Sequence, residues 1–178
     1  MNESESQRNS NSAAPLPRRR HSGWPLAYFI TFPTYGTWLH GDERGSVDRH
    51  HNKPGTPRLG SDHWRNELEH RARRGPAVTR SQEARAVVKR TIDDVARHNR
   101  LLLHAEAVQS NHVHIVISAH LPPERAMNSI KSWSTRRLVE AGLRSPNTRT
   151  WVRHGSTRYL WKPESLYRAC VYVLECQD

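Results

Sequence analysis

Residues 111–117 of this chain read Asn-His-Val-His-Ile-Val-Ile and hold the side chains best suited to chemistry. If this segment is a β-strand, its side chains alternate, so that His112 and His114 share one face while the aliphatic residues enter the core. Two imidazoles on one strand can hold a single divalent ion. Because the chain contains 12 histidines, a chance pair is the competing interpretation. The residues alone leave both open.

A candidate nucleophile, Tyr172, lies in the last predicted helix. At about 100° per residue it falls roughly 120° from the centre of the apolar stripe of that helix, beside the core. A phenol there could reach the face of the sheet and attack a phosphodiester that a metal ion polarises. The structural alternative is a tyrosine packed at the edge of the core. Tyr159 and Tyr167 are competing phenols.

The charge of the chain points to a polyanionic partner. Lys and Arg number 28 against 17 Asp and Glu, which gives a formal net charge of +11. Such a surplus attracts nucleic acid first and an anionic membrane surface second. Tryptophans interleaved with basic residues suit the stacking of unpaired bases and contacts with phosphates, although each alone also suits a core position. The predicted DNA-binding residues are Arg18, Arg19, Arg20, Trp38, Lys131, Arg136, Arg137, Arg153 and Arg158.

Seven elements are needed to position these residues, and hydrophobic periodicity predicts each of them. In chain order they are a strand at 28–32, a helix with apolar residues at 84–95, strands at 101–108 and 112–118, a helix that opens at Pro122 and is capped by Gly142, a strand at 157–161 and a helix from Pro163. This order predicts a ferredoxin-like α+β fold. Its antiparallel split β-α-β sheet would have two backing helices, plus a C-terminal helix that carries the tyrosine.

Local signals predict finer details of these elements. Thr79 and Gln82 have the spacing of a capping box ahead of the first helix. The strand at 101–108 would turn one set of residues to the core, Leu101, Leu103, Ala105 and Ala107. Its other face would carry His104 and Glu106, either near the histidine pair or simply at the surface. The last helix would present one apolar stripe, Leu166, Ala169, Cys170, Val173 and Leu174.

Composition divides the chain into a tail and one domain. Residues 1–22 are rich in Ser, Asn and Pro and end in a basic cluster, so we expect a disordered basic tail. Residues 23–178 form the domain, and residues 41–76, crowded with Gly, Pro, Arg and His, are expected as a long basic loop. No apolar run approaches the roughly 20 residues of a membrane span, and none resembles a signal peptide. A soluble, cytoplasmic protein is the expectation.

From Tyr28 to the C-terminus the chain resembles the insertion-sequence-200-like transposases. These are the single-tyrosine branch of the His-hydrophobe-His nucleases, and the branch includes the REP-associated tyrosine transposases of bacteria. The resemblance is carried by residues 34–42, by Asn-His-Val-His at 111–114, by residues 153–161 and by Tyr172. A His-x-His pair alone would be weak evidence, but the set in this order is more specific.

The resemblance implies a function as well as the fold. In this family the two histidines bind Mg²⁺ or Mn²⁺, and the tyrosine attacks single-stranded DNA to form a 5′-phosphotyrosine link with release of a 3′-hydroxyl. The family usually works as a dimer and recognises a DNA hairpin. The resemblance thus implies that residues 23–178 are a transposase domain, that His112 and His114 are metal ligands and that Tyr172 is the nucleophile.

One position departs from the family pattern. Many relatives place Gln or Asn, as a third metal ligand, one helical turn after the tyrosine, and here that position holds Cys176, a thiol poorly suited to Mg²⁺. Glu175 is better placed around the helix and Gln177 is closer in residue type, so both remain candidates for the third ligand.

Two alternative functions are also open. One is a hairpin-binding protein of the same fold that does not cut nucleic acid, and the other is a metal-dependent hydrolase in which water replaces Tyr172 as nucleophile.

Overall fold

The computed structural model describes residues 23–37, 64 and 77–175, and it contains the expected order of elements. In chain order these are β1 (Ala27–Pro33), α2 (Gln82–His98), β2 (Leu102–Val108), β3 (His112–Ser118), α3 (Pro123–Glu140), β4 (Ser156–Leu160) and α4 (Pro163–Glu175). The expected tail at 1–22, nearly all of the expected loop at 41–76, and Trp38, Cys176 and Gln177 lie outside the described residues.

The four strands form one antiparallel sheet in the order β2-β3-β1-β4. β3 pairs with both β1 and β2, and β4 pairs with the outer side of β1. β1 and β2 therefore run in the same direction with β3 inserted between them, which is the split β-α-β arrangement. The predicted ferredoxin-like α+β class is confirmed, and β3, which carries the two histidines, is an inner strand.

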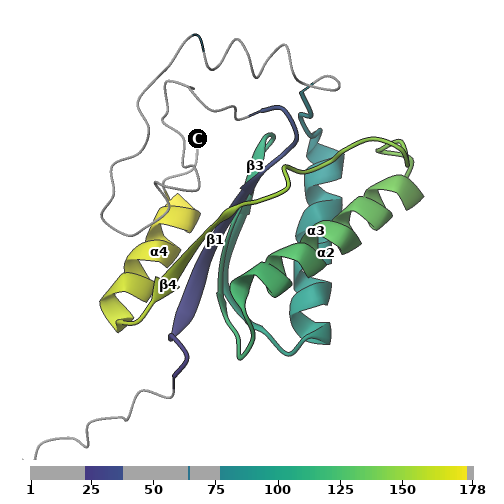
Figure 1. The fold of residues 1–178 in the computed structure, drawn as a ribbon. Helices are drawn as coiled ribbons and strands as arrows, with labels where there is room; N and C mark the ends of the chain where they lie inside the picture. Colours follow the sequence, from purple (N-terminus) through teal and green to yellow (C-terminus); the bar gives the residue numbers. More distant parts are fainter. Residues whose placement is uncertain (1–22, 38–63, 65–76, 176–178) are drawn as a thin grey trace, which may run out of the picture.

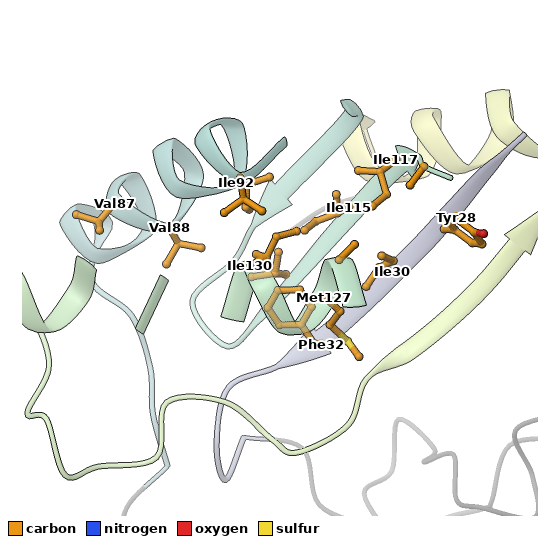
Figure 2. Close-up of a cluster of buried hydrophobic side chains, with 14 of the residues drawn as sticks. Tyr28, Ile30, Phe32, Val87, Val88, Ile92, Ile115, Ile117, Met127 and Ile130 are labelled. Carbon is orange, nitrogen blue, oxygen red and sulfur yellow. The ribbon is translucent and has the colours of Figure 1, made fainter. Parts of the chain in front are cut away.

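Helices cover both faces of the sheet, with α2 and α3 on one side and α4 on the other (Figure 1). The larger core lies between the sheet and the α2–α3 layer (Figure 2). It contains Val113, Ile115 and Ile117, the face of β3 predicted to be buried, together with β1 residues such as Ile30 and Phe32. Burial of large aliphatic and aromatic side chains contributes about 1.5–3 kcal/mol each. This core holds the sheet against α2 and α3.

A second, smaller core lies between the opposite face of the sheet and α4. Its buried members are Ala27, Ala105, Val116, Leu160, Ala169 and Val173. Because small side chains dominate it, α4 can approach the sheet closely. The face of β3 that carries His112 and His114 is thus covered in part by the C-terminal helix rather than left to solvent.

The expected alternation of β2 is wrong because the strand contains a bulge. The register with β3 runs Leu103↔Ile117 and then Ala105↔Val116, so His104 is an extra residue without a partner position. A bulge of this kind reverses the alternation of the residues that follow it. Leu103 therefore packs on the larger core, whereas Ala105 packs under α4.

The observed helix ends differ from the sequence-based predictions in two details. Ser81, not Thr79, caps α2, and its side chain accepts a hydrogen bond from the backbone N–H of Ala84. Gly142 does end α3 as predicted, with a φ of 69° and its N–H donating to Val139. In α4, Leu174 is 65% exposed, so the apolar stripe ends at Val173. None of the helices in the described residues is both long and apolar enough to cross a lipid bilayer.

Candidate metal and nucleophile site

His112 and His114 stand side by side on the α4 face of β3, as their spacing predicts. Their ring centroids are 4.6 Å apart, with the ring planes at 72°. His114 is buried, and His112 is half-buried at the start of the strand. Because β3 is held by β1 on one side and β2 on the other, the backbone that aims both rings is fixed by two ladders of hydrogen bonds.

Each histidine ring has its Nδ1 atom engaged by a neighbouring oxygen. Nδ1 of His112 lies 2.7 Å from Oδ1 of Asn111, and Nδ1 of His114 lies 2.7 Å from Oγ1 of Thr31. An amide oxygen can only accept, so this contact requires the proton on Nδ1 of His112. The Thr31 hydroxyl permits the same tautomer in His114. A hydrogen bond at one ring nitrogen is how ligating histidines are usually oriented for coordination through the other.

The electrostatics of the pair also suit metal ligation. Burial, and secondarily the neighbouring His112, lower the pKa of His114 to about 4. His114 is therefore a neutral imidazole at neutral pH. Only the neutral ring has a lone pair to donate to a cation.

Tyr172 is the phenol that α4 brings to the histidines. Its ring centroid lies 5.6 Å from that of His114, with the ring planes at 74°. Phe29, on β1, contacts both rings, with centroid distances of 5.4 Å to His114 and 5.9 Å to Tyr172. The next residue, Val173, is buried and anchors this turn of α4. Tyr172 remains 44% exposed, so it is not enclosed between α4 and the sheet.

The two competing phenols lie elsewhere. Tyr159 packs edge-on against Tyr28, whose ring belongs to the core on the α2–α3 side. Tyr159 therefore stands on the face of the sheet opposite to the histidines. Tyr167 lies on α4 but is 71% exposed, more than a turn before Tyr172. The fold thus brings Tyr172 to the histidine pair and directs Tyr159 away from it.

A third ligand of the His, Cys, Asp or Glu type is not found in the described part of the chain. Within residues 23–37, 64 and 77–175, no group of three or more His, Cys, Asp or Glu side chains is placed to share one ion. Glu175, the first candidate, therefore does not form such a group with the histidines. Gln177, the second candidate, lies outside the described residues.

Among the expected DNA-binding residues that the structure describes, some are exposed and others make contacts within the protein. Arg136, Arg153 and Arg158 are exposed. Lys131, in contrast, is buried, and its Nζ donates to the backbone carbonyls of Val152 and His154, both at 3.1 Å.

Lys131 therefore holds the loop before β4 rather than a phosphate, and burial lowers its pKa to about 8. Arg137 is ion-paired with Asp94 of α2 and lies over the ring of Trp133. It joins the two helices of the α2–α3 layer. Arg18, Arg19, Arg20 and Trp38 lie outside the described residues.

Three positioning residues were missed by the sequence reasoning. Thr31 and Phe29 share one face of β1, and the alternation of that strand could have placed them on the histidine side once the β1–β3 pairing was known. Arg80 is the third. It is buried, donates to the backbone carbonyls of Gln109 and His112, and stacks on Trp151 at 4.7 Å. It thereby holds the turn that leads into β3, and no local sequence signal indicates this.

His104 and Glu106 do not join the site. His104, at the bulge, lies 2.7 Å from Oγ of Ser118 at the far end of β3. Glu106 faces α2, where Lys89 lies 3.8 Å from its carboxylate. The bulge at His104 is the reason that Glu106 lies on the face opposite to His112 and His114.

Residues 72–164, more than half of the chain, match the family described as Transposase IS200 like. The chain belongs to this family. The matched segment includes β3 with both histidines and ends at the start of α4. Membership of the IS200-like transposases supports a transposase function.

Two solved structures are similar to this IS200-like chain at low identity. One is a REP-associated tyrosine transposase bound to a REP hairpin, with 13% identity and a TM-score of 0.46, over 89% of this chain and 70% of that chain. The other is a protein of Deinococcus radiodurans R1 assigned as a transposase, with 16% identity and a TM-score of 0.44, over 89% of this chain and 95% of that chain. At these values neither likeness carries an argument about function. No curated protein matches the chain.

Proposed function

We propose that this IS200-like transposase cleaves and rejoins single-stranded DNA through a covalent link to Tyr172, with a divalent ion held by His112 and His114. The observation that carries the proposal is the contact between Tyr172 and His114, whose ring centroids lie 5.6 Å apart although the two residues come from different elements. A nucleophile beside a pair of metal-type ligands, in a family of transposases, suits DNA strand transfer through a covalent protein–DNA link.

The histidine pair fits a resident ion. The rings are adjacent, His114 is neutral, and both Nδ1 atoms are engaged by Asn111 and Thr31, an arrangement that suits ligation through Nε2. Two imidazoles cannot complete the shell of Mg²⁺ or Mn²⁺, so water and phosphate oxygens would fill the other positions. When bound, the ion would polarise the scissile phosphate and stabilise the leaving oxygen.

The protein's own residues would carry out the transfer step. The phenolic oxygen of Tyr172 attacks the phosphorus, an O–P bond forms, and the bond from phosphorus to the 3′-oxygen of the preceding nucleotide breaks. The phenolic proton passes to water, and the leaving 3′-oxygen takes a proton from water to become a free hydroxyl. Phe29 limits the position of the Tyr172 ring by its contact at 5.9 Å. Attack by the 3′-hydroxyl of another strand reverses the step and rejoins the DNA.

Binding of the DNA is proposed to rest on exposed basic side chains. Arg136, Arg153 and Arg158 are exposed and can contact phosphates. Residues 1–22 would add non-specific affinity, and unpaired or hairpin-bearing strands would be preferred because stacking needs unpaired bases. We expect removal of residues 1–22 to weaken binding modestly and to leave the domain folded. We also propose that the protein acts as a homodimer, which light scattering of the purified chain would test.

A single experiment tests the proposed reaction. Labelled single strands that carry a hairpin are incubated with the protein and Mn²⁺ or Mg²⁺ and then separated by denaturing electrophoresis. We expect a covalent protein–DNA adduct that mass spectrometry assigns to Tyr172. His112→Ala and His114→Ala should abolish the adduct while retaining most DNA binding, because phosphate contacts supply most of the affinity.

The matched control is His120→Ala, which removes an exposed histidine just beyond β3. It should leave the adduct unchanged. Cleavage without any adduct would indicate water as the nucleophile, and binding without cleavage would indicate a hairpin-binding protein that does not cut. Either result would overturn the proposal.

A further inference from the structure

A hollow of about 300 Å³ lies between α2 and the edge strand β2, and neither histidine of the pair lines it. One stripe of α2 lines it through Gln82, Arg85, Ala86 and Lys89, which recur at helical spacing. The other wall is β2, through Glu106, Ala107 and Val108. A volume near 300 Å³ is at the lower end of sites that hold small molecules.

Two residues that line the hollow each have a buried polar side-chain atom without a hydrogen-bond partner. The side chain of Glu106 is only 9% exposed, and while Oε1 lies 3.8 Å from Nζ of Lys89, Oε2 has no hydrogen-bond partner. Nε of Arg85 is also buried and has no hydrogen-bond partner. Buried polar groups are nearly always paired, so the unpaired acceptor of Glu106 and the unpaired donor of Arg85, on two residues that line one hollow, suit a ligand that offers both complements.

We propose that this hollow receives one unpaired base of the DNA strand, a base that carries an amino group beside a ring acceptor, as cytosine does. The amino N–H donates to Oε2 of Glu106, and the ring acceptor receives the N–H of Arg85. Carboxylates commonly accept from the amino group of cytosine, and arginine commonly donates to base acceptors. This inference rests on the proposed function, because it assumes a DNA substrate.

The charges around the hollow favour a nucleotide over a neutral small molecule. Lys89 is 63% exposed at the rim, and Arg85 lines the same wall, so both can meet the phosphates that flank the base. Thymine fits less well. Its single N–H lies between two carbonyl oxygens, which a carboxylate repels.

The position of the hollow beside β2 also suits a DNA strand that enters the proposed site at His112, His114 and Tyr172. In the β2–β3 register, Ala107 is opposite His114, and Glu106 precedes it by one residue. β2 is an edge strand, so a flexible DNA strand can pass from the α4 face around this edge to α2 without crossing the sheet. The base in the hollow would therefore contribute sequence preference close to the point of cleavage.

The test compares binding of oligo(dC) and oligo(dT) of equal length by fluorescence anisotropy, with the full chain at pH 8. We expect the wild type to bind oligo(dC) more tightly, by about fivefold or more, as one good pair of base contacts supplies. Glu106→Gln should reduce this ratio toward one. Arg85→Gln should lower the ratio as well, because the ring acceptor loses its donor.

Two control variants on α2 match these changes in charge. Glu83→Gln also removes one negative charge and Arg90→Gln also removes one positive charge, but neither residue lines the hollow. Both should shift affinity for the two oligonucleotides equally and leave the dC-to-dT ratio at the wild-type value. Equal binding of oligo(dC) and oligo(dT) by the wild type, or an unchanged ratio in Glu106→Gln, would overturn the inference.

Two further measurements separate the possible failures. If self-association measured by light scattering is lost in Glu106→Gln while the dC-to-dT ratio is unchanged, the occupant is a second copy of the chain, and the inference fails. If the ratio behaves as expected but the wild type forms no adduct with any strand, only the proposed reaction fails. Adduct formation on Tyr172 together with an unchanged ratio would leave the reaction standing and remove the base-binding hollow.

Discussion

Oγ1 of Thr31 lies 2.7 Å from Nδ1 of His114, on the position of β1 that is directly paired with this histidine. The hydroxyl and the ring meet because the two strands are in register, and β1 comes 83 residues earlier in the chain. A partner on Nδ1 sets the orientation and the tautomer of a ligating imidazole. Thr31 is therefore a positioning residue for the proposed ion site.

Thr31→Val should weaken ion binding because it removes the hydroxyl while keeping the shape of the side chain. We expect the affinity for Mn²⁺ to fall about 10–100-fold, the range found when such supporting partners are lost. Titration followed by electron paramagnetic resonance measures this directly. Thr31→Ser keeps the hydroxyl and should retain most of the affinity, and equal losses in the Val and Ser variants would contradict the role of the hydroxyl.

Tyr172→Phe should abolish the covalent adduct without unfolding the protein. The ring contacts with His114 and Phe29 survive the change, so the free energy of unfolding should shift by no more than about 1 kcal/mol. DNA binding should persist, because phosphate contacts do not involve the phenol. Tyr167→Phe, on the same helix, is the matched control and should form the adduct normally. An adduct on Tyr159 or Tyr167 would move the nucleophile and leave the class of reaction in place.

Glu106 should make stability depend on pH. Burial, and secondarily the negative Asp93, raise the pKa of Glu106 from 4.5 to about 7. Below pH 4.5 the carboxyl is protonated in both states. Between pH 4.5 and about 7 the unfolded chain releases the proton first, so stability falls as pH rises through this window and levels off above it.

Glu106→Gln removes this dependence because its side chain does not ionise. The free energy of unfolding of the variant minus that of the wild type should rise by on the order of 1–3 kcal/mol from pH 4 to pH 8. Urea titrations at the two pH values measure the difference. Glu83→Gln, at an exposed position of α2, should follow the wild type. If the difference in stability between the wild type and Glu106→Gln does not change with pH, the prediction is wrong.

Gly155→Ala should destabilise the fold by overpacking. A Cβ at this position would lie 2.5 Å from Sδ of Met127, 2.6 Å from the backbone oxygen of Thr31 and 3.0 Å from Cβ of Phe32. The sulfur can move, but the backbone of β1 cannot do so cheaply, so we expect a loss of about 1–3 kcal/mol. Gly23→Ala is the control, since nothing lies within 4 Å of its added Cβ. Equal melting temperatures for the two variants would show that the strand gives way at little cost.

The sequence by itself determined the elements and the pairing of the two histidines on one face. Alternation along residues 112–118 depends only on the geometry of an extended strand, so the aliphatic and imidazole faces of β3 follow from the order of residues. The order of strands and helices predicted the split β-α-β sheet, because few topologies satisfy short, right-handed connections. Helical periodicity also placed Tyr172 beside the apolar stripe of α4, on the side that reaches the sheet.

Only the tertiary structure decided what surrounds those residues. Thr31 contacts His114 because of the β1–β3 register, which no local signal in the sequence indicates. Lys131 is buried because it donates to two backbone carbonyls of the loop before β4. The bulge at His104 turned Glu106 away from the histidines and into the hollow beside α2. Each of these outcomes depends on contacts between segments far apart in the chain, whereas periodicity reports only the orientation of a side chain within its own element.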